Sequence, residues 1–137
     1  MYKILFGALF ISTLIITGCS DAKPSKPMSS YTFGSQPNIK NYQKRIEESI
    51  KTGLKDPYSA KIGKCLPPMK ASVYNTVGGW VSLCKVNAKN SFGAYAGERS
   101  YAAFIGYSLK TQGHFLMSVS TLEDATSVKN LHVFGIN

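Results

Sequence analysis

The sequence predicts an α+β domain in which one N-terminal amphipathic helix packs on an antiparallel sheet of about four to five strands. Between residues 38 and 54, apolar residues recur in steps of three and four, which is the period of a helix that buries one stripe. After residue 60, short apolar segments are separated by turns that contain glycine or proline, which is typical of strands.

The predicted helix covers residues 38–54 and carries charged residues between its apolar positions. Asn38 can cap its start, and Gly53 together with Asp56 and Pro57 marks its end, because the residue before a proline is disfavoured in a helix. Asp56 can then cap a second short turn with Pro57 at its first position. The apolar stripe consists of Ile39, Tyr42, Ile46, Ile50 and Leu54.

The rest of the domain is predicted to form strands. Gly78 and Gly79 are expected to form the tight turn of a hairpin between the second and third strands. In the third strand, alternate residues from Trp80 to Val86 should share one face, with Val81 and Leu83 on the other. The tail stays ambiguous, because residues 121–124 resemble a helix start and residues 131–136 could form a last strand. The predicted strands are residues 60–66, 72–77, 80–86, 99–109 and 114–120.

The N-terminus has the features of a bacterial lipoprotein signal peptide, predicted over residues 1–18. Lys3 precedes an apolar run over residues 4–16, which is shorter than the roughly 20 residues of a membrane span. The run leads into Ile-Thr-Gly followed by Cys19, which matches the lipobox pattern. Small residues before the cysteine give the peptidase access to the backbone, and the thiol takes the diacylglycerol. We therefore expect lipidation at Cys19.

The residues after Cys19 predict where the protein resides and where its fold begins. In the enterobacterial sorting rule, Asp after the lipidated cysteine retains the protein at the inner membrane, and here that position is Ser20. We therefore expect a lipid anchor on the periplasmic face of the outer membrane. Residues 19–37 are rich in Ser, Pro and Lys without apolar periodicity and read as a flexible tether. Residues 38–137 then form a single periplasmic domain.

The charge is strongly positive and limits the choice of partners. The 16 Lys and Arg against 7 Asp and Glu give +9, and loss of Lys3 with the signal peptide leaves 15 against 7, or +8. Export to the periplasm argues against nucleic acid as the partner. Besides the membrane that holds the lipid, the expected partners are an envelope protein or peptidoglycan. The lysines are spread along the chain, so a solvated surface is the simpler explanation of the charge.

Lipidation of Cys19 leaves Cys65 and Cys84 as an even pair in an oxidising compartment, which predicts a disulfide between them. No metal site and no cofactor are predicted, because these cysteines and the distant His114 and His132 lack ligand spacing. The absence of a C-x-x-C pair also argues against a redox role.

Two motifs stand out: residues 54–60, Leu-Lys-Asp-Pro-Tyr-Ser-Ala, and residues 86–97, Val-Asn-Ala-Lys-Asn-Ser-Phe-Gly-Ala-Tyr-Ala-Gly. Together they resemble a group of small bacterial and prophage-encoded lipoproteins of uncharacterised activity. In that group a helix runs into Leu-Lys-Asp-Pro-x-Ser-Ala, and a later strand leads into Asn-x-Lys-Asn-Ser-aromatic-Gly-x-Tyr-x-Gly. The resemblance covers most of the folded domain and implies a lipoprotein, but it implies no activity.

The second motif has two interpretations. Its polar groups, aromatic rings and glycines could present amides and ring faces to a sugar, a peptide or a protein. Alternatively, Asn and Gly form the turns and the aromatic residues fold back onto the sheet edge. The candidate binding residues are Asn87, Lys89, Asn90, Ser91, Phe92, Gly93, Tyr95 and Gly97.

We expect a binding or interaction module rather than an enzyme. The few acidic residues lack a paired-carboxylate context, and the serines lie in no nucleophile elbow and no Ser-x-x-Lys motif. A structural subunit of an envelope or secretion assembly is one alternative. A cell-envelope hydrolase that uses His114 is another. The prophage association of the similar lipoproteins suggests one specific form of binding, the exclusion of superinfecting phage by blocking a receptor.

Overall fold

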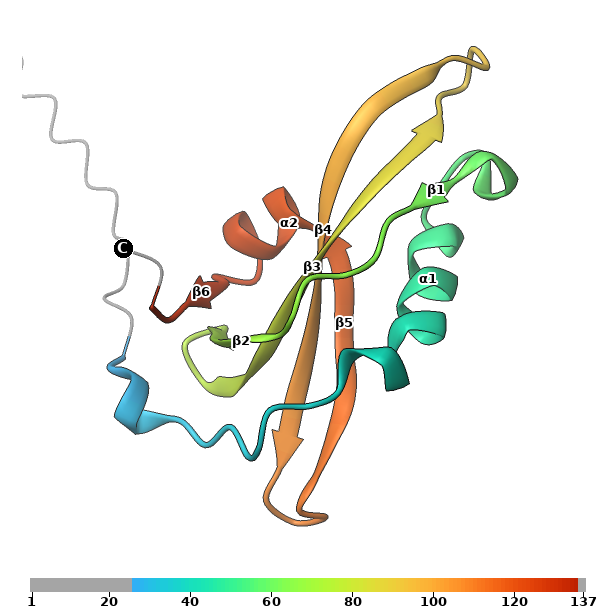
Figure 1. Cartoon of the computed structure of the whole chain (residues 1–137). Coiled ribbons are helices and arrows are strands. Elements are labelled where there is room, and N and C mark those ends of the chain that lie inside the picture. The colour runs from blue at the N-terminus through green and yellow to red at the C-terminus, as the bar shows by residue number, and fades with distance from the viewer. Residues whose placement is uncertain (1–25, 136–137) are drawn as a thin grey trace, which may run out of the picture.

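The computed structural model describes residues 26–135, and an antiparallel sheet forms its centre (Figure 1). The predicted signal peptide, Cys19 and Ser20 lie outside the described residues. The strands are β1 (Lys61–Ile62), β2 (Met69–Val73), β3 (Val77–Lys89), β4 (Tyr95–Ser108), β5 (Gly113–Thr121) and β6 (His132–Val133). The helices are α1 (Gln43–Thr52) and α2 (Leu122–Ser127), and the 3₁₀ turns are η1 (Met28–Ser30), η2 (Ile39–Asn41) and η3 (Pro57–Ser59). Across residues 26–135, no helix is both long and apolar enough to cross a membrane.

The strands follow the order β5-β4-β3-β2-β6, with β1 also paired to β3, and all the pairs are antiparallel. The expectation of an antiparallel sheet accompanied by a helix is confirmed. The sheet has six strands rather than four to five. Five of them overlap the predicted strands, and the sixth is β6, where residues 131–136 could form a last strand. The two longest strands, β3 and β4, form a twisted hairpin that extends beyond the rest of the sheet at one end (Figure 1).

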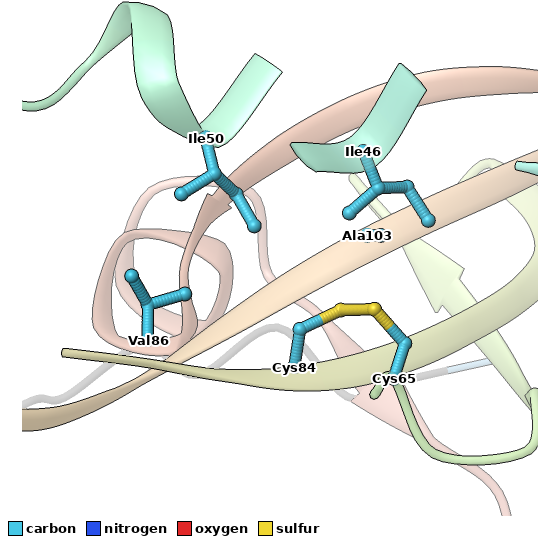
Figure 2. Packing of buried hydrophobic residues seen from close by; sticks show 6 residues of the cluster. All are labelled: Ile46, Ile50, Cys65, Cys84, Val86 and Ala103. Carbon is cyan, nitrogen blue, oxygen red and sulfur yellow. A yellow bond between two sulfur atoms is a disulfide. The ribbon is translucent and has the colours of Figure 1, made fainter. Parts of the chain in front are cut away.

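The two faces of β3 are buried against different helices. Cys84 and Val86 belong to one apolar cluster, beneath Ile46 and Ile50 of α1 (Figure 2). Val81 belongs to a second cluster, which includes Ala125 of α2 and has the partly buried Leu83 packed against it. The alternation predicted for residues 80–86 is therefore correct. Apart from Ser82 and Lys85, every residue from 80 to 86 is apolar, because helices cover this sheet on both faces.

Local capping sets the ends of the helical segments. The Asn38 side chain accepts a hydrogen bond from the Lys40 amide and starts η2, after which α1 begins at Gln43. The chain leaves α1 at Gly53, whose amide bonds to the last turn. Asp56 then caps η3, with its Oδ1 accepting from the Ser59 amide at 3.2 Å and proline at the first position, as expected. Likewise, the Thr121 side chain caps α2, the helix that residues 121–124 suggested.

The turn between β2 and β3 lies elsewhere than predicted. Gly78 and Gly79 are inside β3, and the chain reverses at Tyr74 and Asn75, which have φ values of 54° and 56°. A Cβ on Gly78 would lie 2.6 Å from Tyr31 Cβ, and one on Gly79 would collide with the Ile105 carbonyl oxygen. The two glycines are therefore needed for close packing across the strand, a role that the sequence does not distinguish from a turn.

Gly79→Ala is expected to lower the free energy of unfolding by about 1–3 kcal/mol, because the new methyl group meets backbone that cannot rotate away. The matched control is Gly113→Ala in β5, where a Cβ would lie 3.7 Å from its nearest neighbour, Thr111 Oγ1. We expect the control to change stability by less than about 0.5 kcal/mol. Urea denaturation of both variants measures the difference. Equal losses of stability in the two variants would show that Gly79 does not pack tightly against the Ile105 carbonyl.

The N-terminal strap, residues 31–37, is part of the fold although the sequence assigns it to the tether. Phe33 and Pro37 are buried, and the Trp80 indole donates a 2.9 Å hydrogen bond to the Phe33 carbonyl. The Phe33 ring lies edge-on to Trp80 and to Phe134, with centroids 6.5 and 5.8 Å apart. The sequence of the strap shows neither the helical nor the strand periodicity of apolar residues, because only the isolated positions Phe33 and Pro37 are buried.

Cys65 and Cys84 form the expected disulfide, which lies in the core below α1 (Figure 2). The strand predicted over residues 60–66 is regular only in the two residues of β1. Beyond it the chain still follows β3, because the Gly63 and Leu66 amides donate to the carbonyls of Lys85 and Leu83. The disulfide therefore fastens a partly irregular segment to the longest hairpin.

Candidate functional site

The two sequence motifs meet at the free end of the β3–β4 hairpin. The Lys89 amide donates a 2.9 Å hydrogen bond to Ser59 Oγ, and that hydroxyl donates to the Asp56 carbonyl at 2.9 Å. The Tyr95 hydroxyl donates to the Ser59 carbonyl at 3.3 Å. Ser59 thus joins η3 to both strands of the hairpin. We call this region, residues 56–61 and 87–97, the tip.

The second motif is mostly strand rather than loop. β3 continues to Lys89 and β4 begins at Tyr95, so only residues 90–94 reverse the chain. Asn90 organises the reversal: its Oδ1 accepts from the amides of Phe92 and Ala94 at 2.9 and 3.2 Å. Gly93 supplies a φ of 77°, which disfavours other residues. Asn90 and Gly93 therefore have structural roles and hold the apex in shape.

The aromatic residues of the tip divide into two kinds. Phe92 at the apex is 94% exposed and Tyr58 on η3 is 100% exposed, so neither packs onto the sheet. Tyr95 is 42% exposed, and the amino groups of Lys61 and Lys89 lie 4.5 and 5.7 Å from its ring centroid. The alternative that the aromatic residues fold back holds in part for Tyr95 and is wrong for Phe92. Two large apolar side chains are left in solvent.

The remaining predicted residues surround this apex. Asn87 pairs with Glu98 across the hairpin, and the register between β3 and β4 shifts between Asn87 and Lys89. The Asn87 Oδ1 atom is buried without a hydrogen-bond partner among residues 26–135. Ser91 and Gly97 are exposed, and Gly97 has a φ of 91°. All eight candidate residues are thus brought together in one hairpin end.

A basic hollow of about 330 Å³ lies beside the tip, between the end of α1 and the hairpin. Lys55, Lys89 and Arg99 supply its cations, and no acidic side chain of residues 26–135 lies within salt-bridge distance of any of the three. The nearby Glu98 is bound to Lys85 at 3.2 Å instead. Apolar and small residues line the rest: Gly53, Leu54, Val86, Ala88, Ala96, Gly97 and Tyr101, with Asn90 and Ser91 as further polar groups.

Sequence reasoning missed three residues of this region. Lys55 and Tyr58 belong to the first motif, in which the sequence predicts only the cap at Asp56, and that cap is present. Their place in the motif was the signal that could have marked them. Arg99 carried no local signal, because only the pairing of β3 with β4 places it opposite Val86 and beside the hollow.

His114 lies away from the tip and contacts the N-terminal strap. Its Nε2 atom is 3.1 Å from the Phe33 carbonyl oxygen, and its own carbonyl accepts from the Tyr42 hydroxyl at 3.3 Å. Its ring packs on Tyr107. Within residues 26–135 there is no cluster of three or more His, Cys, Asp or Glu side chains able to hold a metal ion. These contacts give His114 a packing role.

Comparison of the chain with protein-family models, with curated proteins and with solved structures found no match. The features that bear on function are therefore the geometry of the tip and the basic hollow, together with the N-terminal sequence.

Proposed function

We propose that this protein is a lipoprotein anchored through Cys19 to the periplasmic face of the outer membrane, where its tip docks an envelope protein or a cell-wall component. The lipobox and the serine that follows it support the anchor and the membrane. The domain acts as an interaction module and needs no catalytic group for this task.

One observation carries the proposal: two motifs far apart in the sequence cooperate to hold bulky side chains in solvent. Ser59 accepts hydrogen bonds from both hairpin strands and so holds the platform together, and Phe92 and Tyr58 project from it almost fully exposed. Exposed aromatic rings offer large contact area at low entropic cost, and interface cores are enriched in them. Basic side chains nearby, Lys61 over the Tyr95 ring and Lys55 in the hollow, add charge complementarity to an anionic partner.

A photo-crosslinking amino acid at Phe92 is expected to capture one envelope component reproducibly in intact cells, because the side chain at this position is 94% exposed at the apex. Mass spectrometry of the captured species identifies it. The matched control carries the same group at Leu109, which is 69% exposed in the turn after β4.

The comparison between the two crosslinking positions decides the proposal. Capture from Phe92 but not from Leu109 supports docking through the tip. Capture that is equal at both positions, or absent at Phe92, contradicts it. Co-purification of the captured protein as a stable stoichiometric complex would instead identify a structural subunit of an envelope assembly.

A further inference from the structure

We infer that the basic hollow binds the peptide carboxylates of the cell-wall polymer. This inference rests on the proposed function and specifies its ligand: the tip docks the wall rather than a lipid surface, and the hollow supplies the anion site. Three features carry it, namely the cations, the lining of the hollow and its position relative to the anchor.

The cations are available for an external anion. Lys55 comes from the segment after α1, Lys89 from the end of β3 and Arg99 from β4, so the fold assembles them from three places. Both acidic residues near the tip are occupied: Glu98 binds Lys85, and Asp56 caps η3. An arginine beside two lysines suits a carboxylate, because guanidinium can bind it through two parallel hydrogen bonds.

The lining of the hollow fits a short aliphatic peptide. Val86, Ala88 and Ala96 present small apolar side chains, and Gly97 lets the ligand approach the backbone. A volume of about 330 Å³ is at the lower end of the range for small-molecule sites. Cell-wall stem peptides combine free carboxylates with alanine methyl groups. The exposed rings of Tyr58 and Phe92 on the tip can stack on the sugar rings to which the stem peptides are attached.

The position of the hollow favours the wall over the anchoring membrane. The strap joins the sheet at the start of β3, where Tyr31 lies against Gly78 and Phe33 packs on Trp80. Val86, Ala88 and Lys89, which line the hollow, belong to the other end of the same strand. Val86, the first residue of β3 in the lining, follows Trp80 by six positions, which at roughly 3.3 Å per residue is about 20 Å along the strand. The end of the fold that the tether enters is thus the end remote from the hollow.

The test is sedimentation of the full-length lipoprotein, purified in detergent, with isolated wall sacculi. Converting the sacculus carboxylates to amides is expected to weaken retention about tenfold, because the amides carry no charge to pair with Lys55, Lys89 and Arg99. The double variant Lys55→Gln/Arg99→Gln should weaken binding to native sacculi by a similar factor. The control Lys44→Gln/Lys110→Gln removes the same net charge from exposed positions outside the hollow and should change binding less than about twofold.

Each outcome decides the inference. Loss on amidation and in the hollow variant, with the control retained, supports it. Equal retention of native and amidated sacculi overturns it, as does an equal loss in the control, which would show that net charge alone binds the wall. Preference for anionic phospholipid vesicles over sacculi also overturns it. If sacculus retention fails these tests while Phe92 still captures an envelope protein, docking through the tip stands and only the wall ligand is wrong.

Discussion

Replacing Cys65 and Cys84 together with alanine is expected to lower the free energy of unfolding by about 3 kcal/mol. The two residues are 19 apart in sequence, and opening a loop of that size restores roughly this much chain entropy to the unfolded state. The disulfide also contributes buried apolar volume, because both sulfurs lie in the cluster below Ile46 and Ile50 (Figure 2). Such a loss is large beside the 5–15 kcal/mol margin of ordinary domains.

Urea denaturation of the full-length protein and the double variant measures this loss. Reducing agent should shift the midpoint of the parent protein toward that of the variant, and it should leave the variant unchanged. This control separates the covalent bond from the packing of the two side chains. A variant with the stability of the parent would show that the bond adds nothing to the fold.

Phe33→Ala is expected to lower the free energy of unfolding by about 3 kcal/mol, although Phe33 belongs to a segment that reads as a tether. The ring is 9% exposed and makes edge-on contacts with Trp80 and Phe134. The amino group of Lys70 also lies 5.3 Å from its centroid. Truncation therefore leaves a cavity in the third apolar cluster, between the strap and β3.

The matched control for Phe33→Ala is Met28→Ala, in η1, where the side chain is exposed. We expect the control to change stability by less than about 0.5 kcal/mol, measured by urea denaturation of both proteins. Tryptophan fluorescence adds a local readout, because Trp80 bonds to the Phe33 carbonyl and contacts its ring. A Phe33→Ala protein as stable as Met28→Ala would mean that the strap is not part of the core.

The disulfide and the strap also hold the strand that carries the tip. The disulfide fixes the chain beside β3 just after β1, and β1 pairs with the part of β3 that leads into the tip. The strap fixes the opposite end of β3 through Trp80. Loss of either fastening should leave local turns such as the one organised by Asn90 intact, because its hydrogen bonds lie within residues 90–94.

Several features were readable from the sequence because they depend on neighbouring residues. The cap that Asp56 provides to η3, the disulfide of Cys65 and Cys84 and the alternating faces of β3 all follow from local chemistry or from counting. The second motif was also recognised as a unit. Its aromatic residues could not be assigned, because exposure depends on what packs nearby: Ser59 and Lys61 cover part of Tyr95, and nothing covers Phe92 to the same degree.

An antiparallel sheet with a helix, the pairing of the cysteines and two motifs that stand apart from the core pattern can all be predicted from the residues alone. The folded molecule was needed to show that Gly79 is a packing glycine, that Phe33 is core and that Lys55, Lys89 and Arg99 surround one hollow. The physical reason is the range of the interactions. Capping, turns and alternation act over a few residues, whereas a packing glycine, a buried strap and a hollow lined from three segments need parts of the chain that only the folded sheet brings together.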